Sequence, residues 1–306
     1  MCFWLTFLCR RTVLKVLQWS DIVAIATSRN TSTAVTENSS ELKTSHIIVC
    51  HGETVAEIFP QWLRLSYRRG QHYQAYDLNM PPSIPKRPLE QFRYDPPLTE
   101  HGNLTAEFVG HAIKLAKYDP HVIYSSPELR CVQTACAIAR AFTTKAIMVC
   151  VEPALADWVQ LTPQGTSKHW LTPHKYALLG YPINLDYKPY LIELPAVESP
   201  TDYLRRLGHF FFTLSGPNEN IATMHLFIQN CVIVCRLSVV VTNAHAIEAA
   251  RRGPWSNAQQ ICEIKNSIRN GDVCEIMIAP DKRVSIHLIS LLIEFRYFIV
   301  CFCSNP

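Results

Sequence analysis

Short apolar runs alternate with amphipathic helical patterns along most of this chain. The run from Ser45 to Cys50 is closely followed by a glycine and predicts a buried strand. Because strand patterns alternate with helical ones, the chain is expected to form an α/β fold with a largely parallel sheet. Further strands are predicted at 121–125 and 146–151, and helices at 54–67, 99–115, 127–139 and 201–214.

Several residues mark where these elements begin and end. Thr99 is a candidate N-cap for the second helix, and Pro127 is expected in the first turn of the third. Residues 70–98 carry six prolines, so an ordered loop is expected there rather than a helix. Functional loops in a parallel sheet lie beyond the carboxyl ends of the strands. This rule selects Cys50–Glu53, Ser126–Arg130, Glu152–Trp158 and the segment after Val241.

The two ends of the chain differ in pattern from its middle. We expect a poorly structured N-terminal segment at 1–44, a single domain at 45–285 and an apolar tail at 286–306. The stretch Val284–Cys303 has the length of a membrane span, but the charges of Glu294 and Arg296 are costly in a bilayer.

A buried sheet edge is favoured over a transmembrane helix for this stretch, and an error in the gene model is the other favoured explanation. The segment Leu226–Val241 is unusual as well, because it is apolar and β-branched but holds Gln229, Asn230 and Arg236. Such an error would affect residues 1–20, 219–238 and 286–306.

Composition narrows the function classes. Of the 306 residues, 48% are hydrophobic and the formal net charge is +4, which excludes a disordered chain and gives no sign of nucleic-acid or membrane binding. Twelve cysteines without a Cys-x-x-Cys pair indicate buried, reduced thiols rather than a zinc site, so a cytoplasmic protein is expected. No metal or other cofactor is predicted, because no histidine or acidic residue has ligand spacing near the candidate site.

Two residues in the selected loops suit phosphate chemistry. His51 stands at the end of a predicted strand, and Arg130 stands at the start of a predicted helix. An arginine grips a phosphate with two parallel hydrogen bonds, and a helix amino terminus adds N–H donors. An imidazole beside them can attack phosphorus as a nucleophile.

Three motifs strengthen this interpretation: Cys50-His51-Gly52-Glu53, Pro97-Leu98-Thr99-Glu100-His101-Gly102, and the segment from Ser125 to Ala135. Together they resemble the histidine phosphatase (phosphoglycerate mutase-like) superfamily over about residues 45–285. The stretches Leu78-Asn79-Met80-Pro81 and Val151–Trp158 are similar to the phosphatase domain of ubiquitin-associated and SH3 domain-containing (suppressor of T-cell receptor signalling) proteins. The resemblance implies a three-layer sandwich with a mostly parallel central sheet flanked by helices, and a phosphohistidine intermediate.

The resemblance also assigns roles to individual residues. It implies that His51 is the phosphorylated nucleophile, that Arg130 grips the phosphoryl group, and that Asp157 protonates the leaving group. Glu53 belongs to the first motif and is included among the substrate-binding candidates. Glu152 is the alternative acid, although a loop anchor is favoured for it.

The chain departs from the family pattern at three places. Cys50 stands where the family has the first phosphate-binding arginine, and Thr54 stands where the narrower family has another arginine. At the second pocket histidine, an ungapped match places Asn243, whereas a two-residue gap places His245. The ungapped match is favoured, and both residues remain candidates.

These departures lead to an expectation of impaired activity. Losing one donor to a developing oxyanion slows turnover by about 10²–10³, so losing an arginine and a histidine lowers the rate by something like ~10⁴. We expect a weak phosphomonoester hydrolase that acts on a phosphorylated protein or small molecule, rather than a glycolytic mutase. The alternatives are an inactive pseudophosphatase that binds phosphorylated or protein ligands, and a damaged gene model. The sequence does not determine the oligomeric state, and a homodimer is compatible with it.

Overall fold

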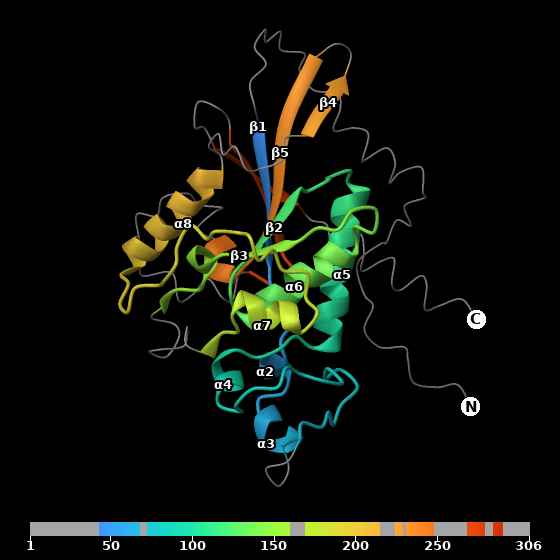
Figure 1. The fold of residues 1–306 in the computed structure, drawn as a ribbon, viewed down its shortest axis with the longest axis vertical. Coiled ribbons are helices and arrows are strands. Elements are labelled where there is room, and N and C mark those ends of the chain that lie inside the picture. The colour runs from blue at the N-terminus through green and yellow to red at the C-terminus, as the bar shows by residue number, and fades with distance from the viewer. Residues whose placement is uncertain are drawn as a thin grey trace, which may run out of the picture. The chain divides into compact units, whose positions relative to one another are not determined.

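The computed structural model describes residues 43–67, 72–159, 169–214, 224–228, 231–247, 268–278 and 284–289. Within these ranges the chain forms a seven-stranded sheet (Figure 1). Its strands are β1 (Lys43–Cys50), β2 (Val122–Ser125), β3 (Val149–Val151), β4 (Met224–Ile228), β5 (Cys231–Thr242), β6 (Val273–Ile278) and β7 (Val284–Ile289).

The central part of the sheet is parallel. Strands β3, β2, β5 and β1 are neighbours in that order, and each adjacent pair is parallel. Beyond β1, strands β6 and β7 continue the sheet in antiparallel pairing, and β4 pairs antiparallel with β5. Parallel strands need helical crossovers, which is why helices separate β1, β2, β3 and β5 along the sequence.

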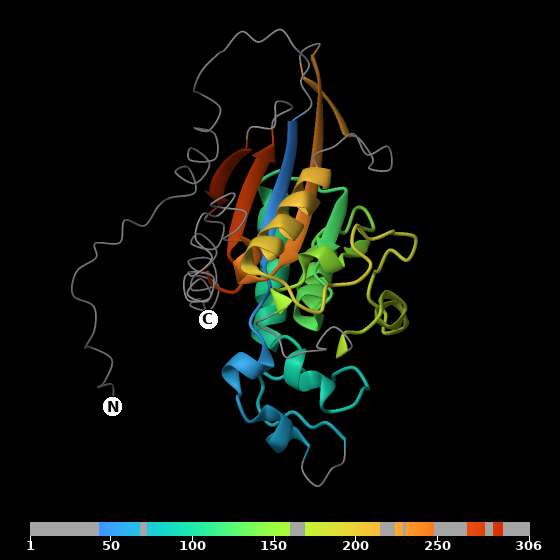
Figure 2. The same ribbon diagram turned by 90° about the vertical axis from the view of Figure 1, so that its left-hand side faces the viewer.

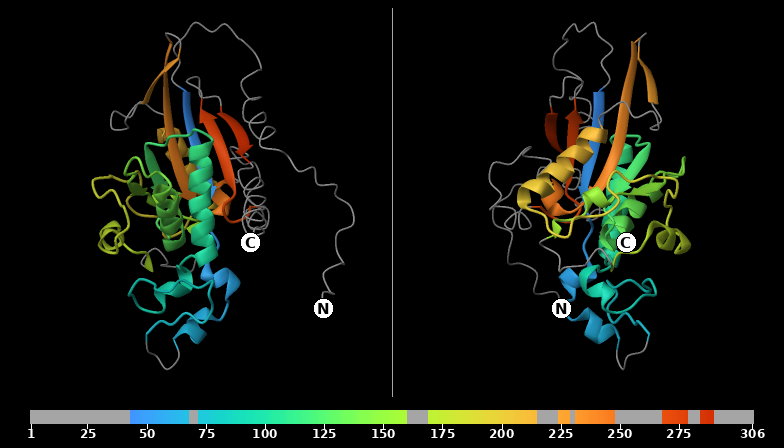
Figure 3. Two further views of the ribbon diagram at one scale, coloured as in Figure 1. Left: turned by 90° about the vertical axis from the view of Figure 1, so that its right-hand side faces the viewer. Right: turned by 60° about the vertical axis from the view of Figure 1, so that its left-hand side comes forward.

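Helices cover both faces of the sheet. Ile47 and Val49 of β1 pack in one apolar cluster with residues of α5 (Glu100–Leu115) and α6 (Leu129–Arg140). Ile48 packs in a second cluster with residues of α8 (Pro200–Leu214), because successive strand residues point to opposite faces. Figure 2 shows α8 in front of the sheet, and the left view of Figure 3 shows α5 on the other side. The predicted three-layer α/β fold with a mostly parallel central sheet is confirmed.

The helix starts are partly as predicted. The Thr99 side chain caps α5 by accepting a hydrogen bond from the Gly102 N–H at 2.9 Å. Helix α6 begins at Leu129 with Glu128 as its N-cap, so the prediction that Pro127 lies in its first turn is wrong. Pro127 instead lies in the bend that leads from β2 to the helix.

The predicted helix at 54–67 is also wrong as a single element. It forms two short helices, α2 (Val55–Ile58) and α3 (Trp62–Ser66), separated at Pro60. Proline has no N–H for the helical hydrogen bond, and its ring clashes with the preceding turn. The remaining short helices are α4 (Gln91–Tyr94), α7 (Pro173–Leu178) and the 3₁₀ turn η3 (Pro153–Leu155).

The two unusual apolar segments contribute strands. Of the first segment, residues 226–228 lie in β4 and residues 231–241 lie in β5, and the stretch that starts at Val284 begins with β7 at the edge of the sheet. Residues 290–303 of that stretch, like residues 1–42, lie outside the described residues. In the described ranges no helix is long and apolar enough to cross a membrane. The expected domain boundaries stay predictions.

Candidate active site

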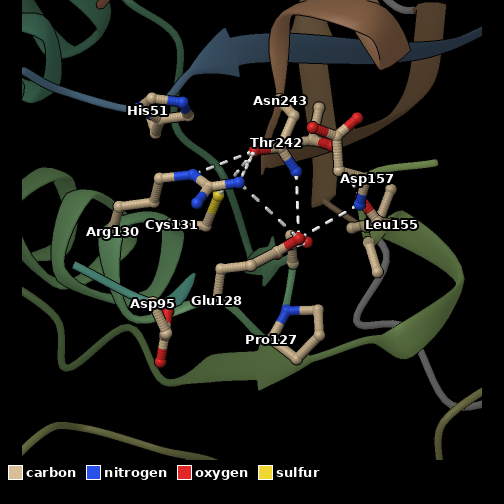
Figure 4. Close-up of polar contacts among 12 residues, drawn as sticks. His51, Asp95, Pro127, Glu128, Arg130, Cys131, Leu155, Asp157, Thr242 and Asn243 are labelled. Atoms are coloured by element: carbon tan, nitrogen blue, oxygen red, sulfur yellow. Dashed lines mark hydrogen bonds and ion pairs between the residues drawn. The ribbon is translucent and has the colours of Figure 1, made fainter. Parts of the chain in front are cut away.

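Three loops and the start of α6 meet beyond the carboxyl ends of the parallel strands. His51 follows β1, Arg130 follows β2, Asp157 follows β3, and Asn243 follows β5. Figure 4 shows the His51 imidazole beside the Arg130 guanidinium, with Asn243 and Asp157 next to them. The structure therefore brings together residues that lie up to 192 positions apart along the chain, as the rule on strand ends predicts.

The backbone determines the tautomer of His51. Its Nδ1 lies 2.8 Å from the Gly52 carbonyl oxygen, which can only accept, so Nδ1 carries the proton. The other ring nitrogen, Nε2, then has a free electron pair. Burial and the nearby charge of Arg130 lower the pKa of His51 to about 4, against weaker opposing effects of Glu57 and Asp157. The imidazole is therefore neutral at pH 7 and can act as a nucleophile.

The loop after His51 is held by the Thr134 hydroxyl and by close packing against the Gly102 backbone. The Gly52 N–H donates to the Thr134 hydroxyl oxygen at 2.9 Å, and that hydroxyl donates to the Arg130 carbonyl at 2.7 Å. A Cβ at Gly52 would lie 2.7 Å from the Gly102 carbonyl oxygen, so no side chain fits there. Thr134 thus connects the loop of His51 with the helix that carries Arg130.

The Arg130 guanidinium binds the side chain of Asn243. Its Nε and Nη2 both donate to the Asn243 Oδ1, at 3.1 and 2.7 Å. The Cys131 thiol also points to this oxygen, at 3.9 Å. Burial alone would lower the pKa of Arg130, but the neighbouring acidic groups, Glu128 first, raise it above its ordinary value. Arg130 therefore stays charged in a setting rich in carboxylates.

Glu128 is a member of this site that the sequence analysis missed. Its side chain is 2% exposed and accepts hydrogen bonds from the Asn243 amide Nδ2 at 3.3 Å and the Asp157 N–H at 3.0 Å. The Ser126 hydroxyl donates to its other oxygen, and the Arg130 Nη2 lies 3.9 Å away. The available signal was a carboxylate two residues before the arginine, which sequence alone does not distinguish from a helix cap.

Asp157 forms a buried pair with His245. The His245 Nδ1 lies 3.0 Å from the Asp157 Oδ1, and the Trp158 N–H donates to the same oxygen at 2.9 Å. Burial opposes ionisation of Asp157, but the hydrogen bond and charge of His245, with the charge of Arg130, lower its pKa on balance. Of the two candidates for the second histidine position, Asn243 contacts Arg130 and His245 contacts Asp157.

The other predicted residues lie outside this network of contacts. Cys50 is 1% exposed and packs in the apolar cluster under α8, where burial, followed by the charges of Asp272 and Glu57, raises the pKa of its thiol. Glu53 accepts from the Thr99 hydroxyl at 2.7 Å and from the Asn79 amide at 3.1 Å, so it holds neighbouring loops together.

Glu152 is a loop anchor, as favoured from the sequence. Its two carboxylate oxygens accept hydrogen bonds from the Tyr187 hydroxyl at 2.6 Å and from the Tyr190 and Leu191 N–H groups at 2.7 and 3.2 Å. These contacts tie the segment around residue 190 to the end of β3. The Glu152 carboxylate therefore holds this loop in place.

The amino terminus of α6 differs from the expectation that it offers N–H donors to a phosphate. The Leu129 N–H donates to the Asp95 Oδ1 at 2.7 Å, and Asp95 is fully buried and paired with Arg87 at 2.8 Å. A protein carboxylate therefore already occupies this donor. The positive end of the helix is partly neutralised before any ligand arrives.

Comparisons with known proteins agree with this architecture. Residues 86–226 match the histidine phosphatase superfamily (branch 1). The chain is 27% identical over 212 residues to ubiquitin-associated and SH3 domain-containing protein A of Mus musculus, covering 67% of this chain and 32% of that protein. It is 32% identical over 145 residues to ecdysteroid-phosphate phosphatase of Drosophila melanogaster, covering 46% and 19%. The chain thus spans about a fifth to a third of the length of these two relatives.

One solved structure has the same fold. It is the ecdysone phosphate phosphatase from Bombix mori in complex with tungstate, with a TM-score of 0.60 and 19% sequence identity. The match covers 81% of this chain and 96% of that chain. At this identity the likeness establishes the architecture alone.

Proposed function

The chain belongs to the histidine phosphatase superfamily, and from this premise we propose that it is a phosphomonoester hydrolase of low activity with His51 as its nucleophile. The observation that carries the proposal is the hydrogen bond from the His51 Nδ1–H to the Gly52 carbonyl, which leaves Nε2 as a neutral nucleophile beside Arg130. The substrate class is a phosphorylated protein or small molecule.

The reaction has two steps. The Nε2 of His51 attacks phosphorus, the bond to the leaving oxygen breaks, and that oxygen takes a proton from the pair formed by Asp157 and His245. Water then attacks the phosphohistidine and gives a proton back to the same pair, the bond from phosphorus to Nε2 breaks, and phosphate and the neutral imidazole are released. Asp157 is ionised in the resting site because its pKa is lowered. A bound phosphoryl dianion favours its protonated form, so substrate itself prepares Asp157 as the acid.

Low activity follows from the side chains that bind the phosphoryl group. Arg130 is the cation that the described part of the site offers, and Cys50, where the family has an arginine, is buried in the apolar cluster. Each missing donor to the developing charge costs about 10²–10³ in turnover. The carboxylates of Glu128 and Asp157, which act on Arg130, add repulsion toward a dianion.

The buried Cys50, which stands where the family has an arginine, supports a second candidate function, an inactive pseudophosphatase. A site with one arginine and several carboxylates can bind a ligand or partner without turning it over. In that case His51 is a remnant of the fold, and binding rather than hydrolysis is the activity.

Hydrolysis of para-nitrophenyl phosphate separates the two functions. The parent protein is compared with His51→Ala and Cys50→Arg, with His174→Ala, an exposed histidine on α7, as the matched control. The first function predicts slow turnover that His51→Ala abolishes and His174→Ala preserves. Restoring one cationic donor with Cys50→Arg raises turnover by about 10²–10³.

Trapped phosphate on residue 51, detected by mass spectrometry after rapid quenching, gives a second readout of the same proposal. An inert parent that gains activity only with Cys50→Arg supports the pseudophosphatase. Parent activity that His51→Ala leaves unchanged rules out the proposed nucleophile.

A further inference from the structure

We propose that Glu128 weakens phosphate binding by holding the Asn243 amide with its carbonyl oxygen turned toward Arg130. The inference rests on the proposed function, because it concerns the affinity of the same site for a phosphoryl group. It makes Glu128 a positioning residue that determines how well this site accepts tetrahedral anions.

The orientation of the Asn243 amide follows from the chemistry of its two partners. A guanidinium has only donors, and an ionised carboxylate has only acceptors. The amide oxygen accepts from the Arg130 Nε and Nη2, and the amide nitrogen donates to the Glu128 Oε1. Turning the amide over would set donor against donor on one side and acceptor against acceptor on the other. Both neighbours therefore oppose the flipped orientation.

Glu128 is itself held as an acceptor. One oxygen receives the Asp157 N–H at 3.0 Å as well as the Asn243 amide, and the other receives the Ser126 hydroxyl. The side chain is 2% exposed, so water does not compete effectively for these bonds. A carboxylate bound by three donors is in the acceptor form that the preceding argument requires.

This arrangement occupies the part of Arg130 that a phosphate needs. A guanidinium grips an oxyanion through two N–H groups on one edge, and Nη2 belongs both to the edge shared with Nε and to the edge shared with Nη1. Here Nη2 donates to the Asn243 Oδ1 at 2.7 Å and lies 3.9 Å from the Glu128 Oε1. A phosphate that takes the Nε–Nη2 edge must displace the Asn243 oxygen, and one that takes the Nη1–Nη2 edge lies beside the Glu128 carboxylate, which repels it.

Asn243 is also withdrawn as a donor. Its amide nitrogen points to Glu128 at 3.3 Å, so it does not serve an incoming anion. The negative charge of Glu128 further opposes a dianion at Arg130. Removal of that charge therefore does two things at once: it lowers the repulsion, and it allows the amide to turn its NH₂ toward the phosphoryl oxygens.

Calorimetric titration of inorganic phosphate into the purified protein tests this inference. Glu128→Gln is expected to bind phosphate about tenfold more tightly than the parent, or better, which corresponds to a favourable change of about 1.4 kcal/mol. Glu107→Gln removes the same charge from a half-buried residue on α5 that pairs with Arg140 at 3.4 Å, and it leaves the affinity unchanged. Arg130→Ala weakens binding. A purely structural role for Glu128 predicts lower stability and no gain in affinity.

Asn243→Ala provides a second test that does not depend on the folding of Glu128→Gln. The substitution frees the Nε and Nη2 of Arg130, so phosphate is expected to bind more tightly although a polar side chain is lost. Weaker binding by Asn243→Ala would mean that Asn243 donates to the anion in the parent, and it would overturn the inference. So would a folded Glu128→Gln that binds phosphate no better than the parent.

Binding and hydrolysis distinguish this inference from the proposed function. An inert parent whose Glu128→Gln variant binds phosphate more tightly supports the inference and contradicts the proposed hydrolysis. A parent that turns over substrate through His51, with no gain of affinity in Glu128→Gln, supports the hydrolysis and overturns the inference.

Discussion

The two sides of the candidate site are built by different means. On the nucleophile side, the His51 ring is oriented by a backbone carbonyl, and the next residue is a glycine pressed against the Gly102 backbone. On the anion side, Arg130 and Asn243 are held by side chains, and Glu128 lies where positive charge would be useful. Backbone contacts persist whatever the neighbouring side chains are. Charge complementarity depends on the identity of each residue. A few substitutions can therefore change the anion side from one that attracts a phosphate to one that repels it.

The two sides also respond differently to charge. Burial and the Arg130 charge keep the His51 imidazole neutral, which suits a nucleophile. The same Arg130 lies among acidic groups, Glu128 first, that raise its pKa and oppose the approach of an external anion. A preserved nucleophile is therefore compatible with weak substrate binding.

The largest expected effect is the dependence of stability on pH that His51 introduces. Its pKa falls from 6.5 in the unfolded chain to about 4 in the fold, so the unfolded state binds the extra proton between these values. The contribution of His51 to the free energy of unfolding is complete above about pH 6.5. It is lost as the pH falls toward 4, and the total loss is about 3 kcal/mol. Urea unfolding of the parent and of His51→Gln across this range measures the difference in slope.

His46 provides the matched control for that measurement. It is a buried histidine of β1 whose pKa burial also lowers to about 4, and its Nδ1 bonds to the Ser238 hydroxyl at 2.8 Å, away from the Arg130 network. His46→Asn should flatten the pH dependence by a similar amount and keep the hydrolysis. A parent whose stability is constant from pH 6.5 to 4 would contradict the described burial of both imidazoles.

The next effect concerns the backbone support of the nucleophile. Gly52→Ala sets a methyl group 2.7 Å from the Gly102 carbonyl oxygen, so the unfolding free energy should fall by about 1–3 kcal/mol and His51 should lose its orientation. Gly208→Ala in α8 is the control, because a Cβ there meets open space. It should stabilise the helix by about 0.5–1 kcal/mol. Equal changes of melting temperature in the two variants would contradict the close contact between Gly52 and the Gly102 backbone.

The smallest effect tests the link between the two sides. Thr134→Val removes the acceptor of the Gly52 N–H and the donor to the Arg130 carbonyl, at a cost of about 1–2 kcal/mol. Thr134→Ser keeps the hydroxyl and should recover most of this stability. Both turnover and phosphate affinity should fall in the valine variant, because the hydroxyl contacts both loops. A loss of only one of them would show that the sides are independent.

Much of the fold could be predicted from local patterns. The apolar run before Cys50 forms β1, Thr99 caps α5, and the alternation of strands and helices produces the parallel centre of the sheet. The break at Pro60 also has a local signal, but the apolar spacing of residues 54–67 continues across the proline and predicts one helix where the chain forms two. Periodicity reports which face is apolar, and a helix interruption can leave that spacing intact.

What the sequence by itself determined is the set of strand-end loops and, through them, the meeting of His51 with Arg130. Strand direction alone brings those loops to one edge of the sheet. Only the tertiary structure decided that Asn243 faces Arg130 while His245, two residues further on, faces Asp157. It also revealed Glu128, whose partner Asn243 lies 115 positions away. The physical reason is that a shift of one residue in the end of a strand changes which side chains meet there. The charged groups around each side chain also come from distant parts of the chain, and their spacing in the sequence does not show that they are neighbours.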